Sequence, residues 1–186
     1  MIDLSKKIDL PDSITVSGKS FRINTDYQFF VLFSSMCKHP HEYDEYNFLY
    51  RGAIPEDKET GFNELVKFAK PARELPRDIG DEPDEILLDY EKDADLIYAA
   101  FWQQYGIDLK GKNLHLHWYK FLALLHGLKD TKLNKIMEFR SYVPAETDGK
   151  EYKKFMLQQK AMWHIEKELS DEEKVAIAAF DAKLKK

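Results

Sequence analysis

The chain has 186 residues, of which 44% are hydrophobic, and its formal net charge is −5 at pH 7. This size suffices for one sizeable core, or for one core with a small appendage, and the negative charge argues against a dedicated nucleic-acid-binding protein. Its single cysteine, Cys37, excludes an internal disulfide framework, and no apolar run approaches the ~20 residues that cross a membrane, so we expect a soluble intracellular protein without a membrane partner.

Residues 14–24, ITVSGKSFRIN, predict a β-hairpin. Two β-prone runs flank a four-residue segment that contains Gly18, which can take the positive φ that a tight turn often requires. A phosphate-binding loop is the alternative reading of Gly18-Lys19-Ser20. We reject it because the first glycine of GxxxxGK[ST] is missing and the following segment reads as a strand.

Helices are expected from residue 27 to residue 69. The first is predicted over 27–38, with Thr25 or Asp26 as its N-cap. A short helix is predicted over 42–51, and a third has Pro55 in its first turn and runs to Ala69. Residues 70–85 contain three prolines and a glycine, which predicts a surface connection.

The next part of the chain combines acidic and apolar residues. Nine acidic residues and one lysine lie between 78 and 95, which we interpret as a solvated linker and helix start, or as a docking surface for a basic partner. Residues 86–109 are predicted to contain a broadly apolar helix with acids on its N-terminal side and Gly106 as its left-handed C-terminal cap. A second broadly apolar helix is predicted over 116–127.

The C-terminal part is predicted to be helical at 131–142 and again within 148–186. The expected fold is therefore mainly α: a compact helical domain with an N-terminal β-hairpin and a C-terminal helical extension. We expect a hairpin segment packed on the body (1–24), a helical core (25–142) and the extension (143–186). Apolar residues of the extension either dock on the body or belong to a semi-independent arm: Phe155, Met156, Met162, Trp163 and Ile165.

Two histidines stand beside a tryptophan in LHLHWYKFLALLHGL. On a helix, residues two apart point about 200° apart, so His115 and His117 cannot chelate one metal from a regular helix. We expect His117 to lie at the helix boundary with its ring bonded to a backbone or carboxylate group. The segment HPHEYDEY has metal-ligand residue types but reads as a loop between helices, so we predict no metal site and no cofactor.

Nothing in the chain assembles a nucleophile, a base and an oxyanion site. Asp93-Ala94-Asp95 has the spacing of metal- and nucleotide-binding pairs in some transferases, but it opens a helix and no alternating strand–helix pattern surrounds it. The dense aromatic residues between 98 and 121 form either a core or a groove for an amphipathic helix of another chain. We therefore expect a protein that is not an enzyme.

Three stretches together carry a resemblance to a known family. INTDY after the hairpin, DADLIYAAFWQQYGIDL and LHWYKFLALLHGL are similar to the gp-fifteen family of bacteriophage proteins, over about residues 14–142. That family occurs in tailed phages and phage-derived elements of Gram-positive bacteria, with genes close to the tape-measure gene. Its members are generally taken to be tail assembly chaperones or related components. The segment from Ala145 onward carries no match.

The resemblance implies a non-enzymatic role in the host cytoplasm, with the tape-measure protein and other tail assembly proteins as partners and a homo-oligomer as a further possibility. An amphipathic partner helix would lie in an apolar groove of this chain. The candidate partner-contact residues are the amphipathic aromatics Tyr98, Trp102, Tyr105 and Tyr119. The candidates for electrostatic steering of a basic partner are Asp89, Asp93 and Asp95.

Two other classes of function stay open at this point. One is a structural tail or connector component retained in the virion, which would be found in finished particles. The other is a metal-dependent enzyme that uses His39, His41 or His117, which would carry stoichiometric metal.

Overall fold

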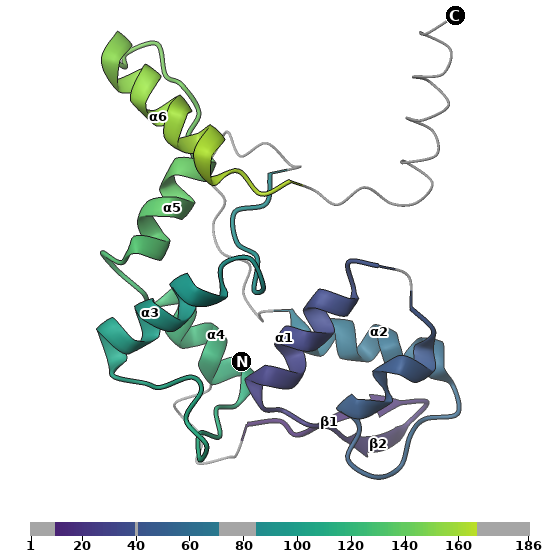
Figure 1. The fold of residues 1–186 in the computed structure, drawn as a ribbon. Coiled ribbons are helices and arrows are strands. Elements are labelled where there is room, and N and C mark those ends of the chain that lie inside the picture. Colours follow the sequence, from purple (N-terminus) through teal and green to yellow (C-terminus); the bar gives the residue numbers. More distant parts are fainter. Residues whose placement is uncertain (1–9, 40, 71–84, 167–186) are drawn as a thin grey trace, which may run out of the picture.

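The computed structural model describes residues 10–39, 41–70 and 85–166, and it is mainly helical with an N-terminal β-hairpin (Figure 1). The expected fold class is therefore confirmed. In chain order the elements are β1 (Ser13–Val16), β2 (Lys19–Arg22), α1 (Tyr27–Met36), the 3-10 helix η1 (Tyr43–Leu49), α2 (Lys58–Ala69), α3 (Ala94–Tyr105), α4 (Trp118–His126), α5 (Lys132–Ser141) and α6 (Lys150–Trp163). Nearly all of the predicted connection at 70–85 lies outside the described residues. The division into three segments stays a prediction.

The predicted hairpin is confirmed, with β1 and β2 antiparallel and Ile14 opposite Phe21. Its two-residue turn has positive φ at Ser17 (49°) and Gly18 (77°), the geometry whose twist matches that of the flanking strands. Ile14 and Val16 are buried, so β1 turns its apolar side toward the core, where it lies against α2.

The start of α1 is fixed by Asp26. One oxygen of the Asp26 carboxylate accepts the backbone N–H of Gln28, and the other accepts that of Leu116 at 3.1 Å. The N-cap therefore also ties α1 to the segment that enters α4. The short helix predicted over 42–51 is present as η1, a 3-10 helix.

The predicted start of α2 is wrong by about one turn. Asp57 is the N-cap and accepts the backbone N–H of Thr60 at 3.0 Å, so the helix begins at Lys58. Pro55 lies before the helix and is buried against Gly61, where a Cβ would approach the proline Cγ to 2.8 Å. The proline thus packs on the helix and does not open it.

Residues 86–93, the first part of the segment predicted to contain this helix, are not helical, and the helix opens at the Asp93-Ala94-Asp95 sequence, as expected for that acidic pair. One Asp89 carboxylate oxygen accepts the backbone N–H groups of Glu91 (2.9 Å) and Lys92 (3.0 Å), which stabilises a turn in place of a helical one. α3 begins at Ala94, and Gly106 at its end has the predicted left-handed conformation (φ 64°).

Stacked aromatic rings fill the core between the helices. Phe121 of α4 stacks on Phe101 of α3 with 5.2 Å between ring centroids, and Trp118 stacks on Phe30 of α1 at 5.5 Å. All four side chains are at most 1% exposed. The second apolar helix of the sequence is therefore core.

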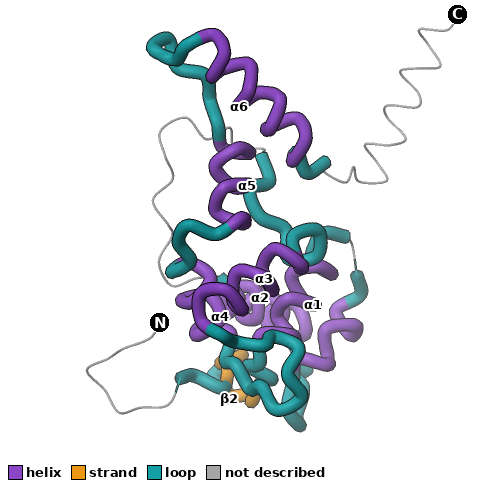
Figure 2. The backbone as a smooth tube through the Cα atoms, turned by 60° about the vertical axis from the view of Figure 1, so that its left-hand side comes forward, coloured by secondary structure: helices purple, strands orange, loops and turns teal. Residues whose placement is uncertain are grey.

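The α5–α6 hairpin extends away from the body in both overall views (Figures 1 and 2). α6 lies along α5 and buries Met156, and Ile165 beyond it is also buried. Phe155 and Met162, which were also candidates for docking, are exposed. In the part of the chain that the structure describes, no helix is long and apolar enough to cross a bilayer.

Candidate partner-binding groove

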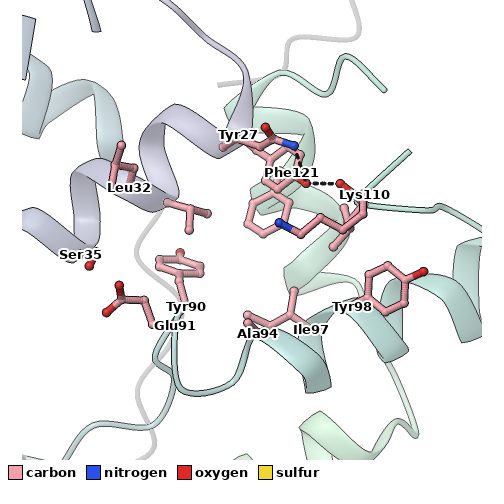
Figure 3. Close-up of a pocket in the computed structure, with 13 residues that line it drawn as sticks. Tyr27, Leu32, Ser35, Tyr90, Glu91, Ala94, Ile97, Tyr98, Lys110 and Phe121 are labelled. Atoms are coloured by element: carbon pink, nitrogen blue, oxygen red, sulfur yellow. Dashed lines mark hydrogen bonds between the residues drawn. The ribbon is translucent and has the colours of Figure 1, made fainter. Parts of the chain in front are cut away.

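A cavity of about 300 Å³ lies between α1 and α3, and we call it the α1–α3 groove (Figure 3). Val31 and Leu32 of α1 line it from one side, and Ile97 and Tyr98 of α3 line it from the other. Phe121 of the core contributes to its floor. Apolar side chains from two helices thus border a hollow of the size that ligand or partner side chains occupy in proteins.

Tyr90 places a polar group among these apolar walls. Its ring packs edge-on against Trp118 with 5.8 Å between centroids, and burial raises the pKa of its hydroxyl to about 12. The hydroxyl makes no hydrogen bond to a described residue. The Tyr90 hydroxyl therefore stays protonated at neutral pH and is available to an occupant of the groove.

Two charged residues mark opposite ends of the groove in Figure 3. Glu91 accepts a hydrogen bond from Lys38 at 3.1 Å, and hydrogen bonds from Ser35 and Lys38 lower the pKa of its carboxyl. Lys110 at the other end is exposed and makes no ion pair with a described residue. The groove therefore has apolar sides and charged ends.

The structure brings together two of the four predicted partner-contact residues. Tyr98 lines the groove and is 37% exposed, and Trp102 follows one helical turn later on α3 with 55% exposure. Residues four apart lie on the same side of a helix, so the two rings form one outward-facing surface. Their contact with a partner stays a prediction.

The other two predicted residues lie elsewhere and are half-buried. The Tyr105 hydroxyl donates to the backbone oxygen of Leu124 at 2.8 Å and joins α3 to α4. Tyr119 stacks on Phe68 of α2 with 4.8 Å between centroids. Both side chains have structural contacts within the described residues, and their role toward a partner stays a prediction.

Two of the three predicted steering residues are buried and paired with a basic side chain, and their role toward a partner stays a prediction. Asp93 is 1% exposed and its charge is matched by Arg140. Asp89 is also buried; burial alone would raise the pKa of its carboxyl, but the Lys38 ammonium at 2.8 Å and two backbone N–H groups outweigh it and lower the pKa. Asp95 is exposed on α3.

His117 occupies the boundary position that the sequence predicted. It is the N-cap of α4: Nδ1 accepts the backbone N–H of Tyr119 at 3.1 Å, and Nε2 lies 3.0 Å from the backbone oxygen of Pro11. Burial lowers the pKa of this imidazole. Across residues 10–39, 41–70 and 85–166, no three His, Cys, Asp or Glu side chains come together as a possible metal site.

Sequence reasoning missed the α1 side of the groove and Tyr90. The signal for α1 was present, because YQFFVLFSSM is apolar around most of its circumference and so leaves Leu32 exposed. Tyr90 lies in the segment predicted to contain the first broadly apolar helix, before that helix begins. It is the turn built around Asp89 that places its ring under the groove.

The sequence model of the family described as Bacteriophage Gp15 protein matches residues 7–165. The chain belongs to this family. Membership places this Gp15-family protein among phage structural and morphogenesis proteins, a class that is not typically enzymatic. The match includes α6, which the resemblance noted in the sequence did not reach. No curated protein and no solved structure matches the chain.

Proposed function

We propose that this Gp15-family protein is a non-enzymatic tail assembly chaperone that binds amphipathic helical segments of the tape-measure protein and keeps them soluble until the tail tube assembles. The observation that carries the proposal is the α1–α3 groove, with Tyr98 on its wall and Trp102 one turn beyond. The shape, size and charge of this groove each suit such a partner.

A groove with two helical walls suits the apolar face of a third helix. Such a face presents anchors at positions i, i+3, i+4 and i+7, which enter a hydrophobic groove while the polar face stays in water. Tyr98 and Trp102 extend the apolar contact surface along α3. Aromatic residues of this kind dominate the energy of many interfaces because they bury a large area with few rotatable bonds.

The limited size of the groove suits a reversible contact. A cavity of about 300 Å³ accepts only a few side chains, and association must first offset the lost translational and rotational freedom of the partner. A chaperone must release its partner when tube subunits take over the same surface. Modest affinity per site, repeated along a long partner, fits that requirement.

The charged groups around the groove favour a partner that carries basic residues beside its apolar face. Asp95 on α3 and Asp108 in the following loop are exposed, and α1 and α3 contain no lysine or arginine. Exposed charges of this kind raise the association rate more than the final affinity.

Coexpression tests this proposal. The tagged protein is produced with the tape-measure protein of the same phage, and the soluble fraction and co-eluting amount of the latter are measured. We expect soluble tape measure only when this chain is present, with several copies bound, and less of it with Trp102→Ala or Tyr98→Ala. Tyr43→Ala, an exposed tyrosine on η1 that does not line the groove, is the matched control.

One outcome would contradict the chaperone role: a tape-measure protein that stays insoluble and unbound in the presence of this chain. In that case a structural tail or connector component becomes the better hypothesis, and mass spectrometry of purified virions would find the chain in finished particles. Equal rescue by the groove variants and the wild type would instead keep the chaperone role and exclude the α1–α3 groove as its binding site.

A further inference from the structure

α6 leaves an apolar surface uncovered, which we call the α6 stripe: Tyr152, Phe155 and Met162. These side chains are 49%, 50% and 69% exposed. Their spacing along the helix places them on one side of α6, next to the side that Met156 buries against α5. Phe155 contacts Phe139 of α5 only edge-on, so much of its ring remains exposed. Gln159 lies between Phe155 and Met162 on this side, so the stripe is three exposed apolar side chains along one side of the helix.

The stripe is held away from the groove of its own chain. The Arg140 Nε donates to the backbone oxygen of Trp163 at 2.7 Å, which fixes the end of α6 on α5. The Lys160 ammonium lies 2.8 Å from the Glu85 carboxylate, and both side chains are largely buried. α6 cannot enter the α1–α3 groove of the same copy without breaking these contacts.

The charges beside the two surfaces are complementary. Lys132 of α5 places its ammonium group 5.5 Å from the ring centroid of Trp163, at the end of α6 where Met162 lies. Lys135 lies 5.5 Å from the ring centroid of Phe139, which contacts Phe155, and it is also paired with Glu138 at 3.1 Å. At the groove, the acidic residues outnumber the basic ones. Glu91 and Lys110 line it, Asp108 lies beside Tyr98, and Asp95 is exposed on α3. Lys38 pairs with both Asp89 and Glu91, so this group of three keeps one negative charge.

We propose that, before a tail protein is bound, the α1–α3 groove of one copy receives the α6 stripe of a second copy. The occupant is an amphipathic helix with lysines beside its apolar face, which is the partner chemistry that the groove favours. The inference rests on the proposed function in one respect only: self-association and the tail-protein helix then compete for the same groove. Binding of a partner would release the neighbouring copy.

The two surfaces lie on different elements, so the contact is head to tail. Such a heterologous contact closes into a ring or extends as a chain, whereas a contact between identical surfaces stops at a dimer. A copy with a blocked groove still offers its stripe, and a copy with a blocked stripe still offers its groove. Two defective variants should therefore complement each other.

The test uses the purified full chain without any tail protein, and light scattering after gel filtration measures its mass. Leu32→Asp blocks the groove and Phe155→Asp blocks the stripe; both side chains are half-exposed, so the core is untouched. Leu157→Asp, an exposed leucine on another side of α6, is the matched control. Circular dichroism confirms that each variant is folded.

We expect wild type and Leu157→Asp to form oligomers that grow with concentration. Leu32→Asp and Phe155→Asp each weaken the association by at least ~30-fold, the effect of removing a hot-spot residue. Their equimolar mixture should contain a dimer with one copy of each variant and nothing larger.

Three results would overturn the inference. The first is a wild-type protein that stays monomeric up to about 100 µM, a concentration at which even weak contacts form. The second is an equimolar mixture of the two variants that stays monomeric. The third is a Leu32→Asp variant that still forms oligomers. None of them depends on the tape-measure protein. The self-association inference and the chaperone proposal can therefore fail separately.

Discussion

Arg140 of α5 and Asp93 at the N-cap of α3 form a buried, two-pronged ion pair. Nη1 lies 2.7 Å from one carboxylate oxygen and Nη2 lies 2.9 Å from the other, and both side chains are almost fully buried. The same guanidinium donates to the backbone oxygens of Leu87 and Trp163. One side chain thus joins the body, the segment before α3 and the end of α6.

We predict that Arg140→Met lowers the free energy of unfolding by about 3–5 kcal/mol, because it leaves the Asp93 carboxylate buried without its counter-charge. Urea denaturation measures the change. Lys135→Met is the matched control, since it removes an exposed ion pair with Glu138 and should cost less than about 1 kcal/mol. Equal losses in the two variants would mean that the buried pair contributes no more than a surface pair.

The surroundings of Asp93 also show which features of this fold can be predicted from the sequence and which cannot. Hydrophobic spacing, caps and turn residues are local signals, so the hairpin and the Gly106 cap were correctly predicted, and Asp26 is one of the two caps proposed for α1. The role of Asp93 depends on Arg140, 47 residues away, and no local pattern reports that pairing. Asp93 does stand at the start of a helix, as predicted, but its buried ion pair could not be predicted from the sequence.

The candidate site also has a part that local sequence signals predict and a part that they do not. Tyr98 and Trp102 share one face of a helix, and their joint exposure follows from a spacing visible in the sequence. The groove itself needs α1 and the Tyr90 ring beside them, which only tertiary packing brings together. The sequence therefore predicted one wall of the site and missed the cavity.

Gly106 provides a test of backbone conformation. Its φ of 64° is in the left-handed region. Among the described residues, chain neighbours and nearby helix backbone apart, no atom lies within 4 Å of the position that a Cβ would occupy, so backbone strain is what opposes a side chain there. We predict that Gly106→Ala lowers the free energy of unfolding by about 1–2 kcal/mol. Gly106→Asn should lose less, since asparagine tolerates this conformation. Equal melting temperatures for both variants and the wild type would contradict the left-handed conformation of Gly106.

His117 predicts how stability depends on pH. Burial lowers its pKa below 6.5, and Nδ1 must stay unprotonated to accept the Tyr119 N–H. Below about pH 6.5 the unfolded chain therefore binds a proton that the folded chain does not, so stability falls as pH falls, by at most ~1.4 kcal/mol per pH unit for one proton. Above that pH the imidazole is neutral in both states and adds no slope.

His117→Asn isolates this contribution. Asparagine is a favourable N-cap whose side-chain oxygen can accept the same N–H, but it does not titrate. Urea denaturation between about pH 5 and pH 7 should give a shallower dependence of the unfolding free energy on pH in the variant, even where its stability at neutral pH is lower through loss of the Pro11 contact. An unchanged slope would assign the pH dependence to other groups.

The last prediction compares two tryptophans of very different exposure. Trp118 is 1% exposed and its Nε1 donates to the backbone oxygen of Ala69 at 2.9 Å, whereas Trp102 is 55% exposed. Trp118→Ala should lower the free energy of unfolding by about 3–5 kcal/mol through the cavity that it leaves. Trp102→Ala should change it by less than about 0.5 kcal/mol, as surface substitutions usually do.

Measuring how much tape-measure protein is bound then distinguishes a partner-contact role of Trp102 from a role in the core. With the fold of Trp102→Ala intact by circular dichroism, any loss of tape-measure protein in the coexpression assay reports on the surface that Trp102 shares with Tyr98. We expect a loss of binding worth about 1–2 kcal/mol, the range between an ordinary interface residue and a hot spot. A Trp102→Ala variant that is stable and binds as well as the wild type would exclude this face of α3 from the interface. A variant that unfolds would instead make Trp102 part of the core.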